Sequence, residues 1–123
     1  MPISDGDRAA VEGYYKAMRL GSAGVSAITE LFTDDAVYIE PFSGGDGRAR
    51  EHVGKSVIGE FLKDSINHRP ADMVVTMERL DAEAGRVRAE WICTAAVFPQ
   101  PMCGIDLYEM RDCKIARLET RLR

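Results

Sequence analysis

The spacing of apolar residues in the first half of the chain predicts three helices. The first covers about Ser4 to Leu20, where Ser4 and Asp7 resemble a capping box at its start. A second, short helix is expected from Val25 to Phe32, and a third begins near Gly54. The stripe of this third helix that we expect to be buried consists of Val57, Ile58, Phe61, Leu62 and Ile66.

From Met73 onward the hydrophobic period changes to two, which predicts β-strands. One strand near residue 90 has a charged face formed by Arg86, Arg88 and Glu90. Its opposite face should point to the core and carries Val87, Ala89, Trp91, Cys93 and Ala95. Another strand is expected from about Cys103 to Arg111, then a tight turn and a last strand. The inward residues of that last strand are expected to be Ala116, Leu118, Thr120 and Leu122.

Helices first and an antiparallel meander last predict an α+β fold, in which the sheet wraps around the helices to bury one face of each. We expect one domain over residues 1–123, because 46% hydrophobic residues suffice for one core. A curved sheet of this kind leaves a cavity lined by apolar side chains, where small ligands bind.

The segment Ala36–Phe42 carries the first candidate for chemistry, because this short strand ends in one carboxylate. Alternation along the strand puts Tyr38 and Glu40 on the same face, which is otherwise apolar. A carboxyl group buried there without a partner would have a raised pKa and could act as a general base near neutral pH. The alternative is a strand-end carboxylate that reaches solvent past Pro41.

Charge and cysteine content narrow the class of protein. The chain has 16 Lys and Arg against 20 Asp and Glu, a net charge of -4, so nucleic acid is not an expected partner. No apolar segment approaches the ~20 residues of a membrane span, and we expect a soluble cytoplasmic protein without a membrane partner. The three cysteines, Cys93, Cys103 and Cys113, lack metal-ligand spacing, so we expect reduced core thiols and no metal.

Three segments carry a resemblance to a known family: Leu31–Ala36, Glu40–Phe42 and Gly54–Phe61. Together they resemble the SnoaL-like and ketosteroid-isomerase-like branch of the nuclear transport factor 2-like superfold, over most of the chain in element order. The resemblance implies a cone-shaped, curved antiparallel or mixed β-sheet wrapped around three N-terminal helices, the cystatin-like α+β barrel. It also implies a homodimer that pairs through its sheets.

The resemblance further implies roles for single residues. The catalytic base of the family, an Asp before a Pro-Phe pair, corresponds to Glu40. The oxyanion-stabilising Tyr of the first helix corresponds to Tyr14, with Tyr15 as a packing neighbour. The second oxyanion donor, a protonated Asp on the penultimate strand, corresponds to Tyr108, so this chain departs from the family there. Tyr14 and Tyr108 would then form a two-phenol hole for the enolate oxygen.

Asp106 lies two residues before Tyr108 and shares its face of the strand. Two alternatives are open for this acid. It lies in the cavity near Glu40, where two carboxylates raise one pKa, or it accepts hydrogen bonds from tyrosine or backbone groups as a structural residue.

Apolar and aromatic residues are expected to shape the pocket. The expected substrate-binding residues are Met18, Tyr38, Phe42, Phe61, Trp91 and Leu118. Trp91 has an equally good interpretation as a core anchor. His52 is expected in a solvated, charged loop from Arg48 to Lys55, and the glycine-rich stretch within 43–53 is expected to be a mobile loop that could form a lid.

These observations lead to three functional hypotheses. The first is a cofactor-independent isomerase or cyclase that moves a proton next to a carbonyl of a small hydrophobic, polycyclic or polyketide-like molecule. The second is an epoxide hydrolase of the limonene type, which needs an Asp, Arg, Asp set. The third is a non-catalytic ligand-binding or dimerisation module, in which Glu40 and Asp106 are paired, exposed or far apart. The charged face of Arg117, Glu119 and Arg121 would be solvated or would face a second copy.

Overall fold

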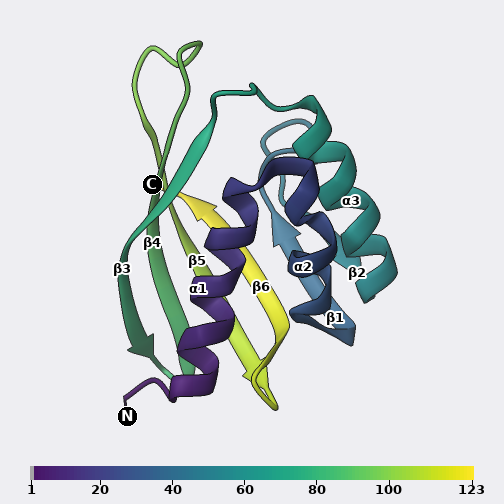
Figure 1. The fold of residues 1–123 in the computed structure, drawn as a ribbon, viewed down its shortest axis with the longest axis vertical. Helices are drawn as coiled ribbons and strands as arrows, with labels where there is room; N and C mark the ends of the chain where they lie inside the picture. The colour runs from purple at the N-terminus through teal and green to yellow at the C-terminus, as the bar shows by residue number, and fades with distance from the viewer. Residues whose placement is uncertain (1) are drawn as a thin grey trace.

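Three helices cover the inner face of a curved, six-stranded mixed sheet in the computed structural model, which describes residues 2–123 (Figure 1). The helices are α1 (Asp5–Arg19), α2 (Val25–Glu30) and α3 (Lys55–His68), with a 3-10 helix over Gly21–Gly24. The strands are β1 (Phe32–Glu40), β2 (Arg50–Val53), β3 (Val74–Glu83), β4 (Arg86–Thr94), β5 (Met102–Arg111) and β6 (Lys114–Leu122).

The strand order is β2-β1-β6-β5-β4-β3, so β2 and β3 form the two edges and the sheet does not close. β1 and β6 are parallel, and all other neighbouring strands are antiparallel. The first and the last strand of the chain are therefore neighbours in the interior of the sheet. The expected α+β fold with a mixed sheet around three helices is confirmed.

The first helix forms as its capping signal predicts. The Ser4 hydroxyl accepts a hydrogen bond from the backbone N–H of Asp7 at 3.1 Å. The inner face of α1 is buried against the sheet and the other helices, and it carries Ala10, Val11, Tyr14, Tyr15 and Ala17. Burial of this apolar stripe stabilises the helix far more than the intrinsic propensity of a 15-residue segment would.

Alternation in β4 predicted its two faces correctly. Val87, Ala89, Trp91 and Cys93 are buried on the concave side. On the convex side the Arg88 guanidinium donates to the Glu90 carboxylate at 2.6 Å. The convex face is therefore a surface of alternating charges, and the concave face carries the core.

Several local predictions were wrong. The second helix ends at Glu30 and Phe32 already belongs to β1, because its ring is fully buried and its backbone pairs with Ile115 of β6. Val57 lies on the outer face of α3 and is 50% exposed. His52 lies in β2 rather than in a loop, and its side chain is buried.

The inward face of the last strand also differs from the prediction. Leu118 and Thr120 are buried as expected, but Leu122 is 49% exposed and Ile115 is buried instead. The β5–β6 pairing shifts register between Glu109 and Met110, and such an irregularity changes which residues point inward.

The expectation of core cysteines holds for one thiol. Cys93 is buried, Cys103 is partly buried, and Cys113 is exposed in the β5–β6 turn. Among residues 2–123, no helix has the length and apolar character that a membrane span requires.

Candidate functional site

A cavity of about 220 Å³ lies between the sheet and the C-terminal ends of α1 and α3. Most of its wall is apolar or aromatic, and Phe42, which is 51% exposed, marks its opening to solvent. The residues that line it are Tyr14, Tyr15, Met18, Tyr38, Phe42, Phe61, Leu62, Ser65, Ile66, Arg69, Met73, Val75, Trp91, Cys93, Met102, Asp106 and Thr120. Five of the six expected substrate-binding residues are among them, whereas Leu118 is fully buried behind the wall.

Asp106 is the acidic residue of this cavity, and its carboxyl group is held by side chains from three directions. On Oδ1 it accepts hydrogen bonds from Thr120 at 2.7 Å and from the indole N–H of Trp91 at 3.1 Å. On Oδ2 it accepts from the hydroxyl of Tyr15 at 2.5 Å and lies 3.2 Å from that of Tyr108. Cross-strand pairing fixes this arrangement, because Asp106 stands directly opposite Thr120.

The pKa of Asp106 is raised above its ordinary value of 3.8. The main cause is burial, which disfavours the charged carboxylate, and it outweighs the hydrogen bonds from Thr120, Tyr15 and Trp91, which act in the opposite direction. A carboxylate whose pKa is raised is a stronger proton acceptor than an ordinary aspartate.

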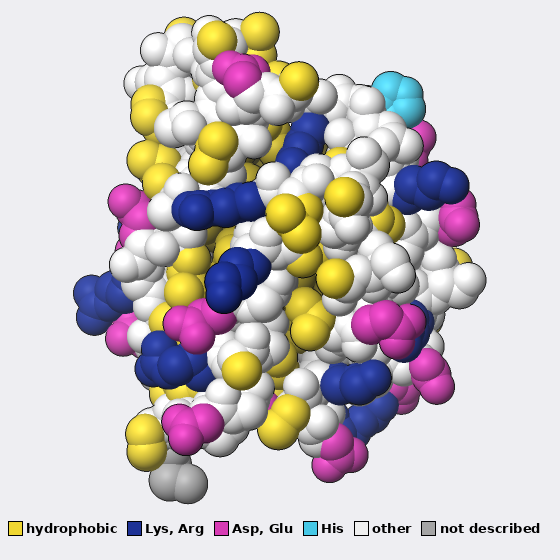
Figure 2. Space-filling model, in the orientation of Figure 1, with side chains coloured by type: hydrophobic (Ala, Val, Ile, Leu, Met, Phe, Trp, Pro, Cys, Tyr) yellow, Lys and Arg dark blue, Asp and Glu magenta, His cyan; other side chains and the backbone are white. Residues whose placement is uncertain are grey.

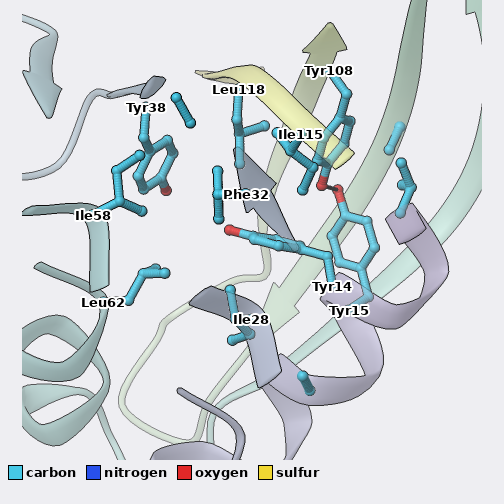
Figure 3. Close-up of a cluster of buried hydrophobic side chains, with 14 of the residues drawn as sticks. Tyr14, Tyr15, Ile28, Phe32, Tyr38, Ile58, Leu62, Tyr108, Ile115 and Leu118 are labelled. Carbon is cyan, nitrogen blue, oxygen red and sulfur yellow. Dashed lines mark hydrogen bonds between the residues drawn. The ribbon is translucent and has the colours of Figure 1, made fainter. Parts of the chain in front are cut away.

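Two further phenols line the same cavity. Figure 3 shows the hydroxyl groups of Tyr14 and Tyr38 pointing toward one another from opposite sides of the core. Burial raises the pKa of both hydroxyls, so both remain protonated and can donate a hydrogen bond at neutral pH.

Glu40, the base expected from the resemblance, lies outside the cavity wall. Its buried carboxylate accepts hydrogen bonds from the backbone N–H groups of Phe42 (2.9 Å) and Ser43 (2.7 Å) and from the Ser43 hydroxyl (2.7 Å). The His52 ring nitrogen Nε2 lies 3.0 Å from the same carboxylate. Burial alone would raise the pKa of Glu40, but the hydrogen bonds from His52 and Ser43 outweigh it, and the pKa is lowered from 4.5.

His52 connects the Glu40 carboxylate to the back of the cavity wall. Its ring stacks on Phe61 with centroids 4.1 Å apart, and it pairs across the strands with Tyr38. The prediction of a solvated histidine overlooked this because β2 is a short strand of mostly exposed residues whose pairing with β1 buries position 52. The Glu40–His52 pair therefore stabilises the end of β1 and the loop that follows it, and it does not face the cavity.

Tyr108 is fully buried and does not line the cavity. Its hydroxyl donates to that of Tyr15 at 2.9 Å, as the dashed line in Figure 3 marks. The structure therefore brings Tyr14 and Asp106 to the cavity, and it places Tyr108 behind Tyr15 and Asp106. It does not bring Glu40 to the same point.

Sequence reasoning missed two residues of the Asp106 site in this role: Tyr15 and Thr120. Tyr15 was assigned to packing although it shares the buried face of α1 with Tyr14. Thr120 was placed correctly on the inward face of the last strand, and the missing information was its pairing opposite Asp106. The inward position of the polar residue Thr120 on β6 was the available signal that a polar residue of β5, here Asp106, would lie opposite it.

Gly104 permits Trp91 to reach Asp106. The glycine and the tryptophan are cross-strand partners, and a Cβ at position 104 would overlap the indole ring. We expect Gly104→Ala to displace the ring, break its hydrogen bond to Asp106 and lower the free energy of unfolding by about 2 kcal/mol. Urea denaturation measures the stability, and the NMR shift of the indole N–H reports its bond. An unchanged indole shift would contradict the expectation.

The epoxide-hydrolase hypothesis and the expectation of no metal site can both be compared with this geometry. For an epoxide hydrolase, Asp106 and Arg69 line the cavity, but a second Asp is not among the lining residues, and Arg86 and Arg88 belong to the outward face of β4 as expected. Within residues 2–123, no group of three or more His, Cys, Asp or Glu side chains is arranged to hold a metal ion.

A fold of three helices on a curved mixed sheet, with a carboxyl group inside the cone, defines a class of small α+β domains with an internal cavity. The family model of the SnoaL-like domain matches residues 11–118, and this chain belongs to that family. Among curated proteins, no relative matches the sequence.

Solved structures show the same fold at low sequence identity. An NTF-2 like protein from Burkholderia xenovorans is 17% identical, with a TM-score of 0.74 over 96% of this chain and 83% of that chain. A proposed ketosteroid isomerase from Kribbella flavida is 18% identical, with a TM-score of 0.74 over 100% of this chain and 82% of that chain. A proposed polyketide cyclase from Sinorhizobium meliloti is 18% identical, with a TM-score of 0.72 over 92% of this chain and 94% of that chain.

Proposed function

We propose that this protein catalyses proton transfer next to the carbonyl group of a small hydrophobic molecule, as an isomerase or cyclase, with Asp106 as the base. The observation that carries the proposal is a single carboxyl group inside an apolar cavity, held by Tyr15, Trp91 and Thr120. The sequence had favoured Glu40 for this role. Asp106 is the better candidate because it lines the cavity and its pKa is raised, whereas Glu40 does not line the cavity and its pKa is lowered.

The proposed role requires that Asp106 can accept a proton from the substrate. The Tyr108 hydroxyl lies closer to Tyr15 (2.9 Å) than to Asp106 (3.2 Å), and a hydroxyl group has one proton to donate. Tyr108 therefore donates to Tyr15 and Tyr15 donates to Oδ2, so Oδ2 accepts one hydrogen bond and keeps capacity for a proton. Tyr108 thus acts as a positioning residue for Tyr15.

The proposed reaction begins with transfer of a proton from the carbon next to the carbonyl to Oδ2 of Asp106. The electron pair of the broken C–H bond moves onto the carbonyl oxygen to give an enolate. Tyr14 and Tyr38, whose hydroxyls line the cavity, would donate hydrogen bonds to that oxygen. In an isomerisation the proton then returns from Asp106 to another carbon. In a cyclisation the enolate carbon attacks a second carbonyl, whose π electrons move to its oxygen, and Asp106 returns the proton to the alkoxide that forms. Neither route requires a cofactor.

The volume of the cavity favours a compact substrate. About 220 Å³ corresponds to roughly seven water molecules and lies below the range of about 300–1,000 Å³ of typical ligand pockets. A molecule with one or two rings fits this space, whereas a four-ring compound would extend past Phe42 into solvent.

The proposal is tested by deuterium exchange into cyclic ketones with one and two rings, cyclohexanone and 2-tetralone, in D₂O. We expect the protein to accelerate exchange of the protons next to the carbonyl, followed by proton NMR. Tyr14→Phe and Tyr38→Phe should each slow the exchange by about tenfold, because each removes one donor to the enolate oxygen. Exchange no faster than in buffer for both ketones would overturn the proposal.

A further inference from the structure

Arg69 is a positive charge in the wall of a cavity that is otherwise mostly apolar. It follows α3 directly and precedes Pro70, which favours the extended backbone that it adopts, with φ -83° and ψ 160°. This conformation turns the chain from α3 toward β3 and places position 69 at the end of the cavity where α1 and α3 terminate.

The guanidinium group of Arg69 is fixed but not neutralised. Its Nη2 donates a hydrogen bond to the backbone carbonyl of Met18 at 2.7 Å, near the C-terminus of α1. Within residues 2–123, the guanidinium of Arg69 has no carboxylate within 4.0 Å and makes no second hydrogen bond. Since a guanidinium has five N–H donors, four remain for a ligand.

Other arginines of this protein behave differently. Arg88, Arg117 and Arg121 each pair with glutamates on the convex face of the sheet. Figure 2 shows that many Lys and Arg side chains on the helical side lie next to Asp or Glu. Arg69 differs from these three in having no acidic partner within the described part of the chain, and from every other described arginine in lining the cavity.

Cys93 lies in the same cavity wall as Arg69. Burial raises the pKa of this thiol, and the positive charge of Arg69 acts in the opposite direction. Trp91, two residues earlier in β4, also lines the cavity and donates to Asp106. Arg69 and Asp106 thus belong to the wall of one cavity.

We propose that Arg69 binds a carboxylate of the substrate, and that the substrate is a one-ring or two-ring carbonyl compound that carries this carboxylate. The inference rests on the proposed function for the reacting carbon, but it concerns binding and has its own readout. A carboxylate accepts two parallel N–H bonds from a guanidinium, which fixes the ligand's orientation and directs its other end toward Asp106.

The test uses a matched pair of probes, 4-oxocyclohexane-1-carboxylate and its uncharged methyl ester. Binding is followed by the fluorescence of Trp91, the single tryptophan, which lines the cavity. We expect the carboxylate to bind about tenfold more tightly than the ester, because a charge-assisted hydrogen bond contributes enough binding free energy for a tenfold change in affinity. Arg69→Gln should remove this preference and leave the affinity for the ester unchanged, while Arg69→Lys should keep part of it.

Arg19→Gln is the matched control. Arg19 also donates to a backbone carbonyl, that of Val75 at 3.3 Å, but it does not line the cavity. This variant should keep the full preference for the carboxylate. Equal affinity of the wild-type protein for the two probes, a preference that survives Arg69→Gln, or no carboxylate binding at millimolar concentration would each overturn the inference.

Deuterium exchange with the same two probes separates this inference from the proposed function. If the carboxylate binds through Arg69 but neither probe exchanges, the proposed function fails and the binding role of Arg69 stands. If both probes exchange equally fast and bind equally well, the proposed function stands and the role of Arg69 fails.

Discussion

Asp106→Asn is expected to slow deuterium exchange into a bound cyclic ketone by about 10²- to 10⁴-fold, the usual contribution of a positioned general base. The asparagine amide cannot accept a proton at neutral pH, whereas its oxygen can still accept hydrogen bonds from Trp91 and Thr120. The cavity should therefore keep its shape, and the loss should appear in kcat more than in KM.

Glu40→Gln is the comparison that decides between the two carboxylates, because it makes the same chemical change at the other buried acid. We expect exchange to persist in Glu40→Gln, provided that the variant is folded at the assay temperature. If Glu40→Gln abolishes exchange and Asp106→Asn does not, Glu40 is the base, and the assignment made from the sequence resemblance is the correct one.

The raised pKa of Asp106 also predicts opposite pH effects on activity and on stability. Activity should increase as the pH rises through the folded pKa of Asp106, because only the carboxylate accepts a proton. The protonated Asp106 carboxyl group stabilises the folded state. This contribution is fully present below the ordinary pKa of 3.8 and is lost as the pH rises through the raised pKa of the folded protein. At pH 8 the Asp106→Asn variant should thus be at least as stable as the wild type, and a lower melting temperature there would contradict this.

Replacement of Glu40 by alanine is expected to cause the largest loss of stability, about 3 kcal/mol or roughly 10 °C in Tm. The reason is the number of donors that converge on its carboxylate, from Phe42, Ser43 and His52. Removal of the acceptor leaves these groups without a partner at the point where β1 enters the following loop. Thermal and urea denaturation at pH 7 measure the effect.

The sign of the pH effect at Glu40 is the reverse of that at Asp106. Because its folded pKa is lowered from 4.5, the stabilisation by its carboxylate is present above 4.5 and is lost as the pH falls through the folded pKa. Glu40→Gln keeps the shape and removes this titration, so its stability difference from the wild type should shrink as the pH falls below about 4. A constant difference between neutral and acidic pH would contradict the expectation.

The periodicity of the chain was sufficient to predict the α+β class, and the family resemblance implied the curved mixed sheet. Helical spacing gave α1 and the core of α3, and alternation gave the two faces of β4, because burial of one face leaves a regular trace in the sequence. Predictions failed where the hydrophobic pattern is short or interrupted. Phe32 follows a helix within two residues, and His52 lies in a strand of four residues. The irregular β5–β6 pairing turns Ile115 inward, and Leu122 is exposed because it is the last residue of β6.

The sequence by itself thus determined the family, the order of the elements and the residues that point inward, among them Tyr14, Trp91 and Asp106. Only the tertiary structure decided that the Asp106 carboxyl group lines the cavity and that the Glu40 carboxylate lies outside it, where it accepts hydrogen bonds from the following loop and His52. That choice depends on strand register and on the path of the chain after β1, which place Thr120 opposite Asp106 and bring Ser43 and His52 to Glu40. Thr120 and His52 are 14 and 12 residues away from their partners in sequence, and local periodicity cannot specify contacts that arise from pairing between strands. Ser43 is only three residues from Glu40, but its contact depends on the turn of the loop after β1.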